Sequence, residues 1–332
     1  MQTVVDLSRL RHNIRIIRTL TGNRFCAVVK SDAYGHGAAV ASYIEPVCDC
    51  FFVATYDEAT ALDATGVKKP ILALGGDISP FLAHVRQNFV PTVVDAAQLA
   101  AAVDAGYNRF SVEIDTGMHR LGANETELER IVSECKMRGV APWSVYSHIY
   151  GGISSARGQA MEFDRLTADP MLRHNRHLYS SCALDLPGNY LFDMTRGGIA
   201  MYGYSRYTEP CMKVRAKIVA LAYVKRGEHV GYGDYTLERD SVIATVRCGY
   251  SDGLRRCDKR LYMTVRGEKC PIVGMPCMDL TMIDVTNVPC RAGEYAYLIS
   301  GKEDCEYLAK CYNTIIYEVL TGFNGRAERI YM

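Results

Sequence analysis

The segment FCAVVKSDAYGHG, residues 25–37, joins a short apolar run to a lysine and a glycine-rich turn. The run at 25–29 predicts a buried strand, because it is short, apolar and rich in valine. Lys30 ends this strand, at a place where burial alone does not favour a lysine, and the sequence YGHG follows shortly after it. The segment therefore predicts a strand whose end carries a polar site.

Lys30 is a candidate for covalent chemistry. A lysine in partly dry surroundings loses its proton more easily than one in water. The neutral amine forms Schiff bases, and the commonest partner of such a lysine in proteins is pyridoxal phosphate. The alternative is a surface lysine that extends its amine into solvent, so the choice depends on residues elsewhere in the chain.

The first two hundred residues alternate short apolar runs with amphipathic patterns. Strands are predicted at 25–29, 51–55, 71–74, 92–94, 110–114, 145–148, 177–181 and near Met194. Helices are predicted at 6–20, 57–64, 95–105 and 126–137, with Asp57 and Asp95 as N-caps. Eight strands alternating with helices are typical of a (β/α)8 TIM barrel. A doubly wound open sheet would instead carry GxGxxG after its first strand, and KSDAYGHG does not match that fingerprint.

Beyond about Glu209 the helical pattern fades. Short β-type runs are predicted at 217–224, 242–246, 262–265, 281–285 and 295–299, with one helix at 305–320. We therefore expect an α/β protein with a barrel over 1–210 and a smaller, mainly-β C-terminal domain over 211–332.

Composition favours an ordinary globular protein. The chain has 48% hydrophobic and 23% charged residues and a formal net charge of +1, so a nucleic-acid or acidic membrane partner is not expected. No run approaches the roughly 20 apolar residues of a membrane span, and the N-terminus lacks a signal-peptide layout. The thirteen cysteines show no zinc-site spacing, so we expect free thiols, no metal and a cytoplasmic location.

Several residues of chemical interest follow predicted strands, which is where barrel enzymes place their active sites. They are Lys30, Tyr34, Arg120, His148, Ser181, Arg196, Gly198 and Ile199. Backbone N–H groups at Gly198 and Ile199, with the Ser181 hydroxyl, would suit a phosphate. Each residue taken singly also has a structural explanation, so their shared position carries the interpretation.

Five segments resemble the alanine racemases. The first, AVVKSDAYGHG at 27–37, resembles the family's pyridoxal-phosphate signature, usually AVVKANAYGHG. The others agree in order and spacing: DTGMHRLG at 115–122, RGGIAMYG at 196–203, GYSDGLRR at 249–256 and PCMDLTMIDV at 276–285. The resemblance covers essentially the whole chain. The sequence is similar in particular to the racemase domains of membrane serine racemases of vancomycin resistance. It implies a bacterial, fold-type III enzyme that supplies D-alanine for peptidoglycan, using pyridoxal 5'-phosphate.

The resemblance also implies catalytic roles. Lys30 would hold the cofactor as an internal aldimine and act as the base on one face of the substrate. Tyr250, supplied by the partner subunit of a homodimer, would be the base on the opposite face. His148 and Arg196 match the residues that assist this tyrosine, and Arg196 would face the pyridine nitrogen.

Further positions match binding residues of the family. Tyr34, Ser181, Gly198 and Ile199 match its phosphate site. Arg120 matches the arginine near the cofactor's phenolic oxygen and the substrate, and Met278 and Asp279 match the loop that meets the substrate carboxylate across the dimer interface.

The sequence departs from the family pattern in two places. Glu113 stands where many members have a carbamylated lysine, and we expect its carboxylate to pair with Arg120. Asn324 or Gly325 stands near a tyrosine that lines the family's substrate pocket, which favours serine as a second substrate beside alanine. The alternatives are a non-catalytic pyridoxal-phosphate carrier, which lacks the second domain, and a barrel decarboxylase, which usually places glutamate rather than Arg196 against the pyridine.

Overall fold

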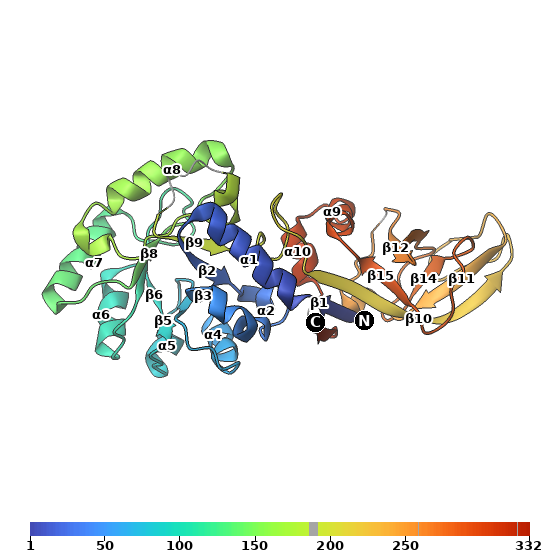
Figure 1. Cartoon of the computed structure of the whole chain (residues 1–332), viewed down its shortest axis with the longest axis horizontal. Coiled ribbons are helices and arrows are strands. Elements are labelled where there is room, and N and C mark those ends of the chain that lie inside the picture. Colours follow the sequence, from blue (N-terminus) through green and yellow to red (C-terminus); the bar gives the residue numbers. More distant parts are fainter. Residues whose placement is uncertain (186–191, 258, 324) are drawn as a thin grey trace.

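A computed structural model describes residues 1–185, 192–257, 259–323 and 325–332. The molecule is elongated, with a barrel of strands and helices at one end and a mainly-β region at the other (Figure 1). The two chain termini lie near each other, between the two regions (Figure 1). This architecture confirms the predicted fold class.

The predicted barrel strands are present as a ring of parallel pairs. Pairing runs in the order β5-β4-β3-β2-β9 and, in a second set, β6-β7-β8. The strands are β2 (Arg24–Val28), β3 (Cys50–Val53), β4 (Ile71–Ala73), β5 (Phe89–Val90), β6 (Thr92–Val93), β7 (Ser111–Glu113), β8 (Ser144–Tyr146) and β9 (Met194–Gly197). Pro91, which has no N–H to donate, separates β5 from β6 within one barrel position.

An extended segment at His177 closes the ring. His177 forms a parallel bridge to Tyr146 in β8, and Arg196 N in β9 donates to Tyr179 O at 3.0 Å. The run predicted at 177–181 therefore occupies a barrel position, although among its described residues only His177 forms a β-bridge. Since parallel strands all point the same way, their C-terminal ends gather on one face of the barrel.

The barrel helices are α1 (Leu7–Thr21), α2 (Lys30–Tyr34), α3 (Val40–Ile44), α4 (Tyr56–Asp63), α5 (Ser79–Ala83), α6 (Ala96–Asp104), α7 (Glu125–Arg138) and α8 (Ile153–Leu166). The four predicted helices correspond to α1, α4, α6 and α7, and each of these begins at a side-chain cap, whereas the other four helices of the barrel region were not predicted. Asp95 caps α6 as predicted, by accepting from Gln98 N. The prediction that Asp57 caps α4 is wrong: Thr55 is the cap, accepting from Glu58 N, because the helix starts earlier than its apolar pattern suggested.

The C-terminal region is built on an eight-stranded sheet. Its path is β13-β12-β15-β10-β1-β16, with β11 and β14 attached through β10. The strands are β1 (Gln2–Val5), β10 (Met212–Val224), β11 (Ser241–Val246), β12 (Tyr262–Val265), β13 (Glu268–Pro271), β14 (Thr281–Asp284), β15 (Tyr295–Ile299) and β16 (Glu328–Tyr331).

The first strand departs from the expected division of the chain. Although the barrel was expected from residue 1, β1 pairs antiparallel with β10 and parallel with β16. The reason is that its partners lie more than two hundred residues away, and local pattern does not reveal such pairing. Both chain ends are therefore part of the C-terminal sheet.

The single helix predicted at 305–320 is also a misassignment. The structure has two helices there, α9 (Lys302–Cys311) and α10 (Ile316–Thr321). Asn313 between them adopts a left-handed conformation with φ of 51°, which an α-helix excludes. Within the described ranges, no helix is long and apolar enough to cross a membrane.

Candidate active site

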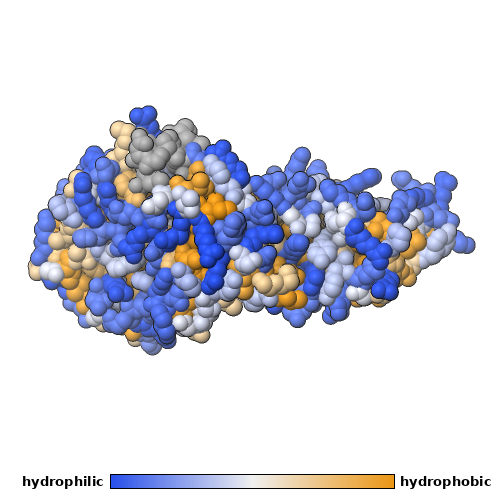
Figure 2. Space-filling view, viewed as in Figure 1, coloured by the Kyte–Doolittle hydropathy of each residue, from blue (hydrophilic) through white to orange (hydrophobic). Residues whose placement is uncertain are grey.

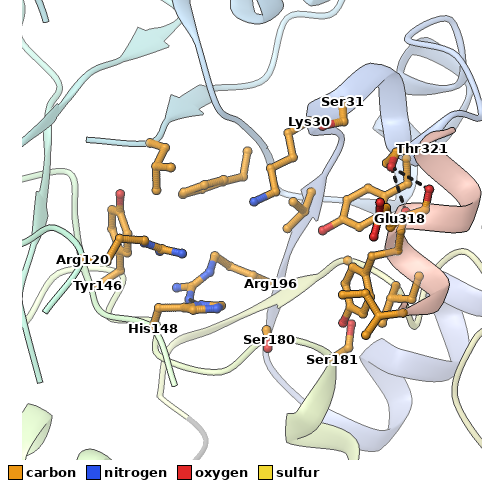
Figure 3. A pocket seen from close by; sticks show the side chains of 18 residues that line it. Lys30, Ser31, Arg120, Tyr146, His148, Ser180, Ser181, Arg196, Glu318 and Thr321 are labelled. Atoms are coloured by element: carbon orange, nitrogen blue, oxygen red, sulfur yellow. Dashed lines mark hydrogen bonds between the residues drawn. The ribbon is translucent and has the colours of Figure 1, made fainter. Parts of the chain in front are cut away.

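A cavity of about 500 Å³ opens at the C-terminal ends of the barrel strands. All the predicted cofactor-binding residues line it: Lys30, Tyr34, Arg120, His148, Ser181, Arg196, Gly198 and Ile199. The side chains of Lys30, Arg120, His148 and Arg196 point into a common space, and α10 closes one side (Figure 3). The expectation that strand ends bring these residues together holds in the structure.

Lys30 starts a strained turn. The next four residues, Ser31 to Tyr34, have φ between 51° and 54°, so they form one turn of left-handed helix without a glycine. Each such residue costs about 1–2 kcal/mol relative to right-handed backbone. Strain of this kind persists only where surrounding contacts hold it, and it is frequent at functional sites.

The surroundings of Lys30 favour the neutral amine. Burial lowers its pKa most, and the positive charges of Arg120 and Arg196 lower it further. Glu58 and Glu113 act in the opposite direction, but the net shift of the pKa is downward. A lysine whose pKa is lowered in this way is suited to nucleophilic and base chemistry.

Arg196 is almost fully buried, at 4% exposure, and its guanidinium donates to neutral acceptors. It donates to the carbonyls of Ser147 at 2.7 Å, His177 at 3.0 Å and Leu178 at 3.1 Å. It also lies 3.2 Å from Nδ1 of His148 and 2.6 Å from Nδ1 of His177.

The surroundings of both histidines favour the neutral imidazole. Burial first, and the charge of Arg196 second, lower the pKa of His148 to about 3 and that of His177 well below its usual value. Since a guanidinium only donates, each imidazole accepts through Nδ1. The network therefore fixes Arg196 in place and leaves it cationic.

Sequence reasoning missed His177. Its ring is fully buried and stacks on Tyr146, with centroids 5.0 Å apart and planes at 14°. It begins a predicted strand rather than ending one, so the strand-end criterion passed over it. The available signal was a histidine inside an otherwise apolar barrel segment.

Glu113 and Arg120 form the predicted pair. Glu113 is buried at 2% exposure, and its Oε1 lies 3.8 Å from Nη2 of Arg120. Its Oε2 accepts a hydrogen bond from Tyr146 Oη at 3.1 Å. Burial raises the pKa of Glu113, while Tyr146 and the two arginines lower it.

The candidate phosphate cradle consists of Tyr34, Ser181, Gly198 and Ile199. A Cβ at Gly198 would lie 3.0 Å from Tyr34 Oη and 3.9 Å from Ser181 Oγ, so glycine keeps this corner open. Burial raises the pKa of Tyr34, which keeps its hydroxyl protonated as a donor. Donors gathered around open space beside a lysine whose pKa is lowered fit a phosphorylated aldehyde such as pyridoxal phosphate.

Three predicted residues do not line this cavity. Tyr250, in the short turn Tyr250–Asp252, is 43% exposed and Met278 is 52% exposed. The Tyr250 N–H donates to Cys277 O at 3.0 Å, so these residues share one exposed corner of the C-terminal region. Asp279 pairs there with Arg326 at 2.8 Å.

Two further expectations concern the C-terminus and metals. Asn324 lies outside the described residues, and Gly325 has φ of 80° with nothing within 4 Å of a hypothetical Cβ. In the part of the chain that the structure describes, no cluster of three or more His, Cys, Asp or Glu side chains is arranged to hold a metal ion.

Comparisons with known proteins point to one family. Residues 5–206 match the family model "Alanine racemase, N-terminal domain", and residues 211–331 match "Alanine racemase, C-terminal domain". The chain is 35% identical to an alanine racemase of Sorangium cellulosum, over 98% of this chain and 97% of that protein. It is 32% identical to one of Desulfovibrio desulfuricans, over 99% and 97%.

Solved structures agree. An alanine racemase of Clostridium difficile superposes with a TM-score of 0.92 at 28% identity, covering 100% of this chain and 95% of that one. The structure of alanine racemase from Bartonella henselae, which carries covalently bound pyridoxal phosphate, gives 0.89 at 27% identity, covering 100% and 99%.

Proposed function

Because this chain belongs to the alanine racemase family, we propose that it interconverts L- and D-alanine with pyridoxal phosphate bound at Lys30. The observation that carries the proposal is the cavity itself, where a partly buried lysine with a lowered pKa faces Arg196 and an open cradle of hydroxyl and backbone donors. Supply of D-alanine for cell-wall synthesis is the role this activity serves in the family.

Pyridoxal phosphate, when bound, draws electrons from the carbon beside the amino group and makes its proton acidic. The chain's own residues determine where that proton goes. Lys30 Nζ, whose pKa is lowered by burial and by two neighbouring arginines, would remove or return it on one face. Arg196, held by neutral acceptors, would meet the pyridine nitrogen with a group that does not surrender its proton.

Racemisation requires a second proton carrier on the opposite face. We assign this role to Tyr250 of a partner subunit, because Tyr250 is exposed and does not line the cavity of its own chain. A tyrosine pKa near 10 needs assistance at neutral pH, and His148 beside Arg196 would supply it. Apolar residues reach the surface near the junction of the two regions (Figure 2), which favours a homodimer there.

Serine is a second proposed substrate. The tyrosine that narrows the family's pocket is absent, since Asn324 or Gly325 stands near its position in this sequence. A wider pocket would admit a hydroxymethyl side chain. A serine-to-alanine turnover ratio far below about one in a thousand would exclude this proposal.

The cytoplasm is the proposed location. The twelve cysteines whose side chains the structure describes are free thiols, and most are buried, as expected in a reducing compartment.

The experiment that tests the function is purification followed by an absorption spectrum and a chiral assay with L-alanine and L-serine. We expect a coloured protein, from cofactor bound at Lys30, that produces D-alanine. Lys30→Ala should lose both the colour and the activity. A colourless protein that does not take up added pyridoxal phosphate would refute the proposal.

A further inference from the structure

The strained turn that carries Lys30 is held by side chains from distant parts of the chain. On the barrel side, Glu58 in α4 accepts from the backbone of Ser31 at 2.8 Å and of Ala54 at 2.7 Å. Its carboxylate therefore ties the first left-handed residue to the loop after β3. The turn also receives support from the opposite side.

Asp32 lies in the middle of the turn and connects it to the last strand. Its Oδ1 accepts from Ala38 N at 2.7 Å, and its backbone carbonyl accepts from Gly37 N at 2.8 Å. Its Oδ2 forms an ion pair with Arg329 of β16. Arg329 Nε also donates a hydrogen bond to Gly35 O at 3.4 Å.

Steric contact reinforces this pairing. A Cβ at Gly37 would overlap the Tyr331 hydroxyl and lie 2.6 Å from Arg329 Cδ. A Cβ at Gly35 would overlap Leu320 O in α10. The end of the chain therefore packs directly against the turn, with no space between them.

The strand that supplies Arg329 is itself anchored. β16 pairs with β1 over four residues, from Gln2↔Glu328 to Val5↔Tyr331, and β1 pairs with β10. The Arg329 side chain is only 20% exposed, so its ion pair with Asp32 is partly shielded from water. Arg329 thus connects the C-terminal sheet to the residue two positions after Lys30.

We infer that Asp32 and Arg329 are a positioning pair, which holds the left-handed turn against the C-terminal sheet and so sets the direction in which Lys30 enters the cavity. The role given to Lys30 rests on the proposed function. The contacts by which Asp32 and Arg329 hold the turn do not depend on it. Neither residue contacts the cavity, so both act through the turn.

The test uses Asp32→Asn, Arg329→Gln and the double variant. Asparagine keeps an acceptor for Ala38 N and removes only the charge, so Asp32→Asn is the milder change. If Arg329→Gln does not fold, Asp32→Asn alone tests whether the ion pair holds the turn. The matched control is Arg266→Gln, which removes an exposed ion pair with Glu294 (2.8 Å) in the same region.

Two measurements are made on cofactor-free protein. Hydrogen exchange reports protection of the backbone at residues 31–37. The rate at which Lys30 reacts with an amine-specific reagent, followed by mass spectrometry, reports how the lysine is presented. Capture of added pyridoxal phosphate, followed by absorbance, is a third readout.

We expect exchange at 31–37 to rise about tenfold or more in each single variant. Capture of the cofactor should slow about fivefold or more, and the double variant should resemble the more affected single variant, because both changes break one interaction. The Arg266→Gln control should match the wild type in all three readouts.

Protection at 31–37 unchanged within about twofold would overturn the clamp. Faster hydrogen exchange at 31–37, with an unchanged rate of reagent labelling at Lys30 and unchanged capture of pyridoxal phosphate, would overturn the role of the ion pair in positioning Lys30. A wild-type protein that does not take up pyridoxal phosphate would refute the proposed function instead, while the exchange and reagent rates would still decide this inference.

Discussion

Glu113 Oε1 lies 3.8 Å from Arg120 Nη2, and the same carboxylate accepts from Tyr146 through its other oxygen. The glutamate is buried, whereas the side chain of Arg120 is 40% exposed and lines the cavity. A buried acceptor on the barrel side therefore faces a more exposed arginine. It also places negative charge near Lys30, whose pKa it raises against the effect of the arginines.

Replacing Glu113 with glutamine should lower kcat/KM for alanine by about tenfold, equivalent to ~1.4 kcal/mol of transition-state stabilisation. The amide keeps an acceptor for Tyr146 but removes the charge that holds Arg120. Steady-state kinetics measure the effect. Glu125→Gln, which breaks an exposed ion pair with Arg165, is the control and should leave kcat/KM unchanged. Unchanged activity in Glu113→Gln would show that Arg120 is oriented by other means.

The sequence predicted the barrel and most of the cavity because both depend on local signals. Apolar runs located the barrel positions, and strand ends located Lys30, His148 and Arg196. The left-handed turn was not predictable, since Ser31 to Tyr34 contain no glycine and the turn's contacts with Glu58 and Arg329 come from distant parts of the chain. Likewise β1 takes its place from partners more than two hundred residues away.

Two fully buried histidines, His36 and His177, and the partly buried His148 should make the cofactor-free protein sensitive to mild acid. Burial lowers the pKa of His36 to about 4 and that of His148 to about 3, and it lowers that of His177 well below its usual value. The unfolded chain binds protons at these residues near pH 6.5, whereas the folded protein does not. Above that pH these groups therefore do not affect the free energy of unfolding. As the pH falls from about 6.5 toward 4, their protonation in the unfolded chain lowers the free energy of unfolding.

Each histidine contributes about 1.2 kcal/mol between pH 6 and 5, so the free energy of unfolding should drop by roughly 3.5 kcal/mol over this pH unit. Urea unfolding at a series of pH values measures the slope. His12→Gln, at an exposed position of α1, should leave the slope unchanged. A flat profile from pH 7 to 5 would mean that the buried rings take up protons without cost.

Gly198→Ala should weaken pyridoxal phosphate binding by about tenfold while leaving the fold intact. The new methyl group would stand 3.0 Å from Tyr34 Oη. The Tyr34 ring has little freedom to move away, because it packs against Tyr202 at 5.0 Å and Tyr317 at 5.8 Å between centroids. Titration followed by absorbance measures the affinity.

The control for this change is Gly158→Ala. Gly158 lies in α8, where a Cβ meets nothing within 4 Å, so alanine should be neutral or stabilising by about 0.5–1 kcal/mol. Equal cofactor affinity in Gly198→Ala and wild type would place the phosphate elsewhere in the cavity.

Tyr250→Phe should lower the rate of racemisation by about 10²–10⁴-fold, yet retain proton exchange on the face served by Lys30. In deuterated water, one enantiomer of alanine should therefore still exchange its α-proton while the other does not. Chiral chromatography with mass spectrometry separates the two. Equal loss of exchange from both enantiomers would argue against two bases on opposite faces.

Mixing the inactive variants Lys30→Ala and Tyr250→Phe tests whether the tyrosine comes from a partner. Each hybrid dimer would combine both changes in one site and leave the other site intact. Since random mixing makes half of the dimers hybrid, about a quarter of wild-type activity should return after the subunits exchange. If Tyr250 served its own chain, every site would carry one change, and no activity would return at any mixing ratio.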